Sequence, residues 1–320
     1  MIFIENRNSH DPAINLALEE YLSKQLDNTQ SYLLLYQNRP SVILGRNQNL
    51  YEEIDFWYAH QREIGIYRRV SGGGAVFHDL GNLNYSFLQP FDTQLIGNWA
   101  AIAAPVLKAL NQKNVPAALN YRNDILVDGK KVSGTAQRAG KHLMVSHGTL
   151  LFDSDLEALF RSLNPDRGTI TSQSLKSFRS KVTNLRGWLP RNWTVSHLRD
   201  YLRETISTDT YALSEAEWRA VEELAEEKYR SWDWVFGRSP AFTLERQMRW
   251  ENTQVTMRLE VQRGGRIQSL KFSEAGSLWA TLARELPGTS YRLSDLRKTL
   301  RKHFLLPPQR EQKLIEFLYG

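Results

Sequence analysis

The chain has 320 residues, 41% of them apolar and 11% aromatic, which is enough for about two folded domains and excludes disorder throughout. It contains no cysteine, so disulfides, iron–sulfur clusters, cysteine-ligated zinc and a cysteine nucleophile are excluded. The net charge is +6, and residues 241–320 account for all of it, with 14 of the 41 basic and 8 of the 35 acidic residues. Either an acidic partner or a basic solubilising surface explains that excess.

Strands and helices alternate along the first half of the chain. Asp11 and Pro12 are typical of a helix start, because Asp caps the first turn and Pro fits it. The patterns of apolar residues predict helices at 12–26, 54–64 and 97–112, and strands at 2–5, 31–36, 41–45, 66–70, 75–78 and 82–88.

Helices dominate the second half. Asp128-Gly129 between β-forming residues predicts a hairpin over 124–134, and a strand region follows at 142–153. Helices are expected at 154–163, 194–206 and 214–230. Gly, Ser and Pro near 237–241 indicate a boundary between a domain of residues 1–240 and a smaller one of residues 241–320, which holds two strands within 253–272 and two or three helices.

A long stretch, residues 167–199, contains seven basic residues and no acidic one. A loop of that length is either functional or loosely held, and a phosphate or an acidic partner would suit its charge.

The segment from Arg68 to His78 is the most informative for function. Gly72, Gly73 and Gly74 leave the backbone open to a ligand, and successive amides can face an anion beside the two arginines. A bulge or tight turn between two strands explains the glycines equally well. The segment is neither a Walker loop nor a dinucleotide fingerprint, since Phe77 occupies the third glycine position.

A second segment places Lys130 and Lys131 on opposite faces of a predicted strand, so that one can face a site. The small residues Ser133 to Ala136 would let a substrate approach, although an ordinary surface hairpin has the same pattern. The seven histidines form no recognisable metal site, and no nucleic-acid signature appears. We expect no membrane span, no signal peptide and a cytoplasmic protein.

Together these segments resemble the lipoate–protein ligases. The family's glycine-rich motif matches Arg68 to Asn82, its lysine motif matches Lys131 to Ala136, and its H-G-T-L-L matches His147 to Leu151. Further matches are the R-N-D at 122–124 and stretches at 38–49, 179–185 and 232–237. The resemblance is strong over residues 5–245 and weaker beyond them.

The resemblance implies an α+β fold: a catalytic domain like those of class II synthetases and biotin ligases, with a small α+β C-terminal domain. It implies that lipoate and ATP, with Mg²⁺, give lipoyl-AMP and pyrophosphate. The lipoyl group then passes to a lysine of acidic acceptor domains, in 2-oxoacid dehydrogenase E2 subunits or the glycine-cleavage H protein. Nucleic acid and membrane are not expected partners.

The site residues expected from the resemblance fall into three groups. Lys131 would be the catalytic cation, contacting the lipoyl carboxyl group and the phosphate. The metal ligand is left open, because Asp124 could either hold Mg²⁺ or orient Lys131. The nucleotide would be held by Lys131, Arg69 and the amides of Gly74, Ala75, Val76 and Phe77, under the basic loop 167–191. Lipoate would contact Ser71, Gly72, Gly73, His78, Gly134, Thr135, Ala136 and His147.

Three rival functions remain to be weighed. Octanoyl transferases need a cysteine nucleophile, and the chain has none. A lipoyltransferase that uses preformed lipoyl-AMP would keep the same motifs. A non-catalytic protein that binds lipoyl domains would not need Lys131 or the glycines.

Overall fold

The computed structural model describes residues 1–140, 142–163, 169–174, 176–177 and 180–319, which form two compact units. The first unit comprises residues 1–46, 65–160 and 178–231, and the second comprises residues 47–64, 161–177 and 232–320. The boundary expected at 240/241 stays a prediction. None of the helices formed by the described residues combines the length and the apolar character needed to cross a bilayer.

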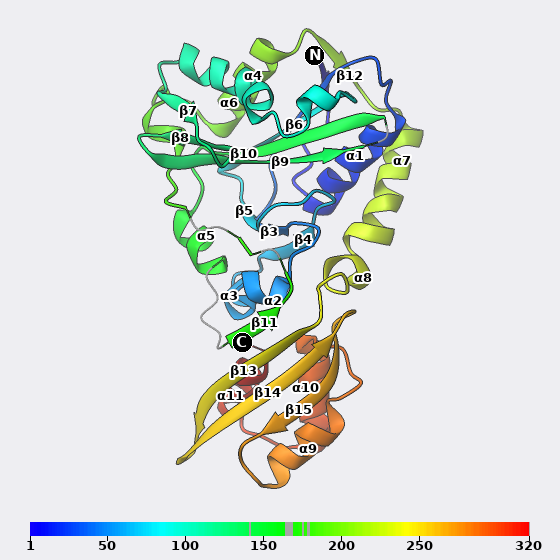
Figure 1. Ribbon diagram of the computed structural model, residues 1–320, viewed down its shortest axis with the longest axis vertical. Coiled ribbons are helices and arrows are strands. Elements are labelled where there is room, and N and C mark those ends of the chain that lie inside the picture. The colour runs from blue at the N-terminus through cyan, green and yellow to red at the C-terminus, as the bar shows by residue number, and fades with distance from the viewer. Residues whose placement is uncertain (141, 164–168, 175, 178–179, 320) are drawn as a thin grey trace. The chain divides into compact units, whose positions relative to one another are not determined.

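A mixed sheet of eight described strands is the centre of the first unit (Figure 1). Its first three strands are parallel and the others are antiparallel. The order is β12 (Asp209–Tyr211), β1 (Ile2–Ile4), β2 (Tyr32–Tyr36), β6 (Asn82–Pro90), β10 (Leu143–Leu151), β9 (Lys130–Ala139), β8 (Asp124–Val127) and β7 (Ala117–Leu119).

The two faces of this sheet differ in their cover. Helices α4 (Trp99–Gln112) and α6 (Val195–Ile206) share an apolar core with one face, to which Leu83, Tyr85 and Phe87 of β6 contribute. Side chains alternate along a strand, so Ser86 and its partner His147 on β10 lie on the opposite face. Helix α1 (Pro12–Gln25) packs against β6 and β10 on that face.

A smaller sheet of β4 (Gly65–Arg68), β3 (Ser41–Leu44) and β5 (Val76–His78) carries the glycine-rich segment. Helix α7 (Glu215–Leu224) continues as a π-helical turn, η3 (Ala225–Tyr229), and both pack on α1. The predicted helix 214–230 therefore has the right extent but changes pitch after Leu224. The first unit also contains the short turns η1 (Thr93–Leu95) and η2 (Leu185–Gly187), while α5 (Leu156–Ser162) runs from the first unit into the second.

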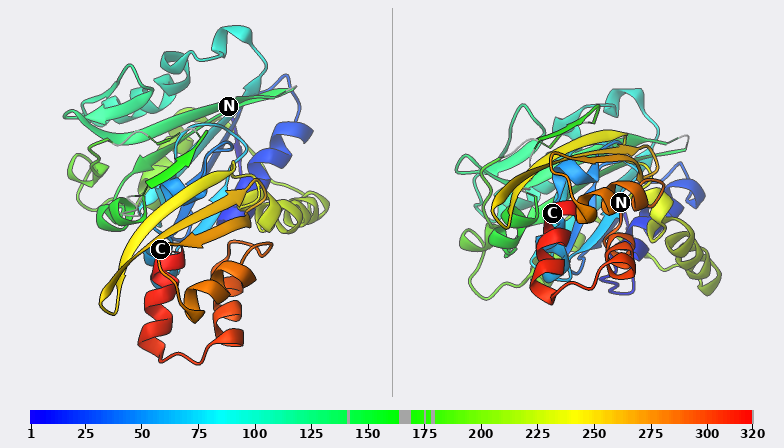
Figure 2. Two further views of the ribbon diagram at one scale, coloured as in Figure 1. Left: turned by 60° about the horizontal axis from the view of Figure 1, so that its bottom comes forward. Right: turned by 90° about the horizontal axis from the view of Figure 1, so that it is seen from below.

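The second unit is built on an antiparallel sheet in the order β11 (Thr169–Ser172), β13 (Phe242–Trp250), β14 (Thr253–Gln262) and β15 (Arg266–Phe272). Helices α9 (Ser277–Glu285), α10 (Leu293–His303) and α11 (Pro308–Tyr319) gather on one side of β13–β15 (Figure 2). Three shorter helices complete the described part: α2 (Leu50–Glu53), α3 (Phe56–Gln61) and α8 (Trp232–Val235).

The helix predicted at 54–64 is present as α3 but is shorter at both ends, and the preceding helix α2 was not predicted. The structure has α2 and α3, because Asn49 and Asp55 each cap a helix start by accepting a backbone N–H. With the two helices so placed, Tyr51 and Phe56 contact each other and form an aromatic cluster with Phe242, Tyr291 and Tyr319. The cluster lies wholly within the second unit and joins its first and last segments.

Candidate active site

The glycine-rich loop between β4 and β5 packs tightly on the end of β3. A Cβ atom added at Gly45 would lie 2.0 Å from the carbonyl oxygen of Gly73, so the two chains can approach only because Gly45 has no side chain. Gly73 has φ +90°, a left-handed conformation that side-chain-bearing residues rarely adopt. At least these two glycines are therefore required by the backbone itself.

Arg69 lies beneath this loop, buried to 5% exposure. Its guanidinium donates to the carbonyl oxygens of Ile43 (3.0 Å), Gly72 (2.6 Å) and Gly74 (2.8 Å), and its Nε donates to Ser71 Oγ (3.0 Å). Burial lowers the pKa of Arg69 to about 10, against the opposing effects of Glu19 and Tyr36, so it stays charged at neutral pH.

These hydrogen bonds orient the peptide groups of the loop. The C=O and N–H of one peptide point in opposite directions, so the Gly72 carbonyl turned toward Arg69 turns the N–H of Gly73 away from it. The arrangement suits an anion on the outer side of the loop. The described contacts of Arg69 are with the protein, and its expected contact with a nucleotide stays a prediction.

Lys131 forms an ion pair with Asp124 across the β8–β9 hairpin, with Nζ 2.7 Å from Oδ1. The Lys131 side chain is 24% exposed and that of Asp124 is 10% exposed, whereas Lys130 is exposed. The two lysines thus differ in environment, as the alternation of a strand predicts. The Lys131 N–H donates to the carbonyl oxygen of Lys181, and the Thr183 N–H donates to that of Lys131, so the strand is fixed at this point.

Strand β9 brings the lysine and the loop together. A Cβ atom added at Gly134 would meet Lys131 Nζ at 2.8 Å, and one added at Gly73 would meet Ala136 Cβ at 3.7 Å. Positions 134 and 136 share one strand face and are about 7 Å apart. Thr135 faces the other way and contacts the hydroxyl of Tyr85 at 3.1 Å.

The remaining predicted residues lie around this arrangement. Val76 and Phe77 pair with β3 in the small sheet, and Phe77 is buried. Gly72 has open space around its α-carbon. Whether each of these residues touches a ligand stays a prediction.

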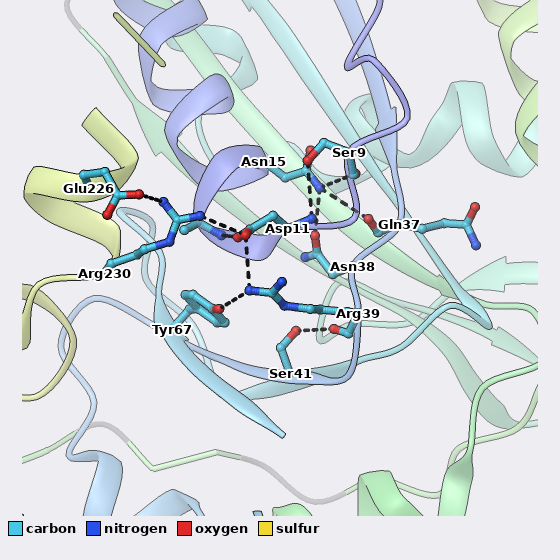
Figure 3. A network of polar contacts seen from close by, with 11 residues as sticks. Ser9, Asp11, Asn15, Gln37, Asn38, Arg39, Ser41, Tyr67, Glu226 and Arg230 are labelled. Carbon is cyan, nitrogen blue, oxygen red and sulfur yellow. Dashed lines mark hydrogen bonds and ion pairs between the residues drawn. The ribbon is translucent and has the colours of Figure 1, made fainter. Parts of the chain in front are cut away.

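His78 is linked to a polar network at the start of α1. Asn38 Nδ2 lies 2.9 Å from His78 Nδ1. Asn15 donates to Asn38 in turn, as Figure 3 shows. The same network holds Asp11 between Arg39 and Arg230. Burial, with the positive charge of Arg69 and the His147 ring, lowers the pKa of His78 to about 3. His78 is therefore neutral at physiological pH.

Sequence reasoning missed one residue, Glu19 on α1. Its carboxylate lies 2.8 Å from His147 Nδ1, and His147 Nε2 lies 2.7 Å from Ser71 Oγ. A signal was available, because Glu19 falls three residues after Leu16 and three before Leu22, on the apolar stripe of a helix. A carboxylate on such a stripe needs a buried partner.

The basic loop predicted at 167–191 is described only in part, since residues 167–168, 175 and 178–179 lie outside the described residues. Its strand β11 pairs with β13, and the hydroxyls of Ser172 and Ser174 donate to Glu52 of α2. The described part of the loop near its start thus belongs to the second unit.

Comparison with known proteins identifies the family. Residues 11–207 match the model of the lipoyl protein ligase A/B catalytic domain. The chain is 44% identical over 271 residues to the lipoate-protein ligase LplJ of Bacillus subtilis, covering 82% of each chain. The chain belongs to this family of ligases.

Solved structures of lipoate-protein ligases share the fold. A crystal structure of lipoate-protein ligase A bound with ATP superposes with a TM-score of 0.62 at 25% identity, over 74% of this chain and 98% of that one. LipL1 of P. falciparum, in complex with lipoate, superposes with a TM-score of 0.64 at 21% identity, over 100% of this chain and 99% of that one. The α+β fold expected from the sequence, with a small C-terminal part, is confirmed.

Proposed function

We propose that this protein is an ATP-dependent lipoate–protein ligase. The observation that carries the proposal is the placement of Lys131 and the anion-suited glycine loop on one face of β9 in a chain of this family. Lipoate is the ligand in the P. falciparum structure, and ATP is the ligand in the ligase A structure. We propose that this activity takes place in the cytoplasm, where ATP is available.

The first step joins two anions. A carboxylate oxygen of lipoate attacks the α-phosphorus of ATP, a P–O bond forms, and pyrophosphate leaves with the electrons of the bond that breaks. Lys131 is the cation that offsets their repulsion and the charge that develops on the phosphoryl oxygens. The loop amides would bind the same phosphate from the other side.

Asp124 has the geometry of an orienting residue, since its Oδ1 holds Lys131 Nζ at 2.7 Å. The described residues contain no cluster of three metal-ligating side chains. Mg²⁺ bound by ATP phosphates needs only one or two protein carboxylates, and Asp124 fits that need. We therefore propose that Mg²⁺ enters with ATP, where it would neutralise phosphate charge.

The second step is aminolysis. The amine of an acceptor lysine attacks the acyl carbon of lipoyl-AMP, and an amide bond forms. The bond between the acyl carbon and the phosphate oxygen breaks, AMP leaves with the electrons of that bond, and the amine gives up a proton to solvent. No enzyme nucleophile is needed, which agrees with a chain that lacks cysteine. We propose acidic lipoyl domains of E2 subunits or the H protein as acceptors, because residues 241–320 carry the chain's basic excess.

The decisive test incubates the protein with an acceptor lipoyl domain, ATP, Mg²⁺ and lipoate, and measures acceptor mass. A gain of one lipoyl group that requires ATP supports the proposal. Lipoate-dependent exchange of pyrophosphate into ATP tests the first step alone. Transfer from supplied lipoyl-AMP without such exchange would show a lipoyltransferase instead, and binding of the acceptor with neither activity would show a non-catalytic protein.

A further inference from the structure

A chain of buried polar side chains connects α1 to the glycine loop. Glu19 is 1% exposed, His147 is 8% exposed and Ser71 is 2% exposed. Successive heavy-atom distances are 2.8 Å from Glu19 Oε1 to His147 Nδ1, 2.7 Å from His147 Nε2 to Ser71 Oγ, and 3.0 Å from Ser71 Oγ to Arg69 Nε. The four side chains come from α1, β10 and the loop.

With His147 neutral, the following assignment of protons satisfies every contact in this hydrogen-bonded series. Arg69 Nε–H donates to Ser71 Oγ, the Ser71 hydroxyl donates to His147 Nε2, and His147 Nδ1–H donates to the Glu19 carboxylate. Burial alone would raise the pKa of Glu19, but the His147 ring and the charge of Arg69 lower it overall. Glu19 is therefore an anion that fixes the tautomer of His147.

The glycine loop depends on this series of hydrogen bonds, because Arg69 contacts both Ser71 and the carbonyl oxygens of the loop. The guanidinium that receives its orientation from Ser71 also holds the carbonyl oxygens of Gly72 and Gly74. If Ser71 turned away, Arg69 would lose the contact at Nε, and of its described contacts only that with the Ile43 carbonyl would remain to orient the guanidinium from outside the loop.

We propose that Glu19 is a positioning residue for adenylate formation, acting through His147 and Ser71 to hold the glycine loop in its anion-binding shape. The inference rests on the proposed function for what the loop binds, but the shape of the loop can be measured without it. Ser71 is not assigned as a nucleophile, because it is buried and its oxygen accepts from Arg69.

The main variant is Glu19→Gln, which keeps the size of the side chain and removes its charge. The matched control is Glu20→Gln, at the next position of the same helix. Glu20 is also buried, but it pairs with Lys24, Lys228 and Tyr229 and has no described contact with the loop. Ser71→Ala removes the hydroxyl group at the other end of the hydrogen-bonded series. This variant replaces Glu19→Gln in the test if Glu19→Gln does not fold.

Two measurements separate positioning from a merely structural role. Amide hydrogen exchange of the ligand-free protein should accelerate in residues 69–76 for Glu19→Gln and Ser71→Ala, and not for Glu20→Gln. In pyrophosphate exchange, the first two variants should raise KM for ATP by about 10- to 100-fold, the usual effect of one hydrogen bond to a charged group. Combining them should add little beyond Ser71→Ala alone.

Several results would overturn the proposal. One is a fall in melting temperature with unchanged loop exchange and unchanged KM per folded molecule. If the increases in KM for ATP were fully additive in the double variant, Glu19 and Ser71 would act separately. If a fluorophosphonate labelled Ser71, the serine would be a nucleophile. If the wild-type protein forms no adenylate, the proposed function fails, while the exchange measurement still decides whether Glu19 holds the loop.

Discussion

Replacing Lys131 with alanine should abolish most adenylate formation while the protein still folds. The ammonium group lies 2.7 Å from Asp124, and a Cβ atom added at the neighbouring Gly134 would meet it at 2.8 Å. Removing one well-placed group that stabilises developing charge lowers a rate by about 10²–10³. The protein should still fold, because breaking a mostly buried ion pair costs about 3–5 kcal/mol, against a usual stability of about 5–15 kcal/mol.

The assay is lipoate-dependent exchange of labelled pyrophosphate into ATP, with the melting temperature measured on the same samples. Lys130→Ala is the matched control, since the neighbouring side chain is exposed and should change neither quantity appreciably. Asp124→Asn should lower the rate less than Lys131→Ala, because the ammonium group stays in the site while the carboxylate that orients it, and that fits the Mg²⁺ of ATP, loses its charge. Equal losses from Lys130→Ala and Lys131→Ala, or normal exchange in Lys131→Ala, would refute the assignment.

Three further changes follow from the same geometry. Gly134→Ala places a Cβ 2.8 Å from Lys131 Nζ, so the lysine must move and the rate of pyrophosphate exchange should fall by up to ~10². Gly187→Ala is the control and should leave that rate unchanged, because there is open space around Gly187. Equal exchange rates in the two variants would contradict the prediction. The folded-state pKa of His78 is about 3, below its usual 6.5, so its contribution to stability is complete above pH 6.5 and is lost as pH falls toward 3. Urea unfolding of His78→Gln should show a shallower acid dependence than wild type, and parallel curves would refute the assignment. Lipoyl transfer to an acidic acceptor should slow as salt rises from about 0.05 to about 0.5 M, and a salt-independent rate would remove the electrostatic role proposed for residues 241–320.

Much of the secondary structure could be predicted, because its signals are local. The cap at Asp11 and the Asp128-Gly129 turn each decide an element within a few residues. Strands β7, β11 and β12 were not predicted, and each has only three or four residues. β12 forms because it pairs with β1, which lies about 200 residues earlier in the chain. The local sequence of β12 does not predict that pairing.

The long strand β13 was missed for a different reason. Its residues from Glu245 onward are mostly polar or partly exposed, so it lacks the apolar alternation that marks its neighbour β14. Its backbone is satisfied by β11 and β14 on its two sides, a property that depends on tertiary contacts.

The residues of the candidate site also fall into those that a local motif predicts and those that depend on tertiary contacts. Lys131 and the loop glycines could be predicted because each motif is continuous in the chain. Glu19 could not be assigned a partner, since His147 and Ser71 come from segments 128 and 52 residues away. The loop-shaping hydrogen bonds of Arg69 also escaped prediction, because a sequence does not show which way a guanidinium turns.

The aromatic cluster of the second unit has a consequence for the order of folding during synthesis. Tyr51 and Phe56 are made early, but their partners Tyr291 and Tyr319 lie near the other end of the chain. The first unit can close once α7 and η3, which end at Tyr229, pack on α1, whereas the second cannot close until α11 has been made. Through most of translation the apolar side chains of α2 and α3 are therefore without their native cover, which exposes the nascent chain to misassembly and to chaperone binding at that segment.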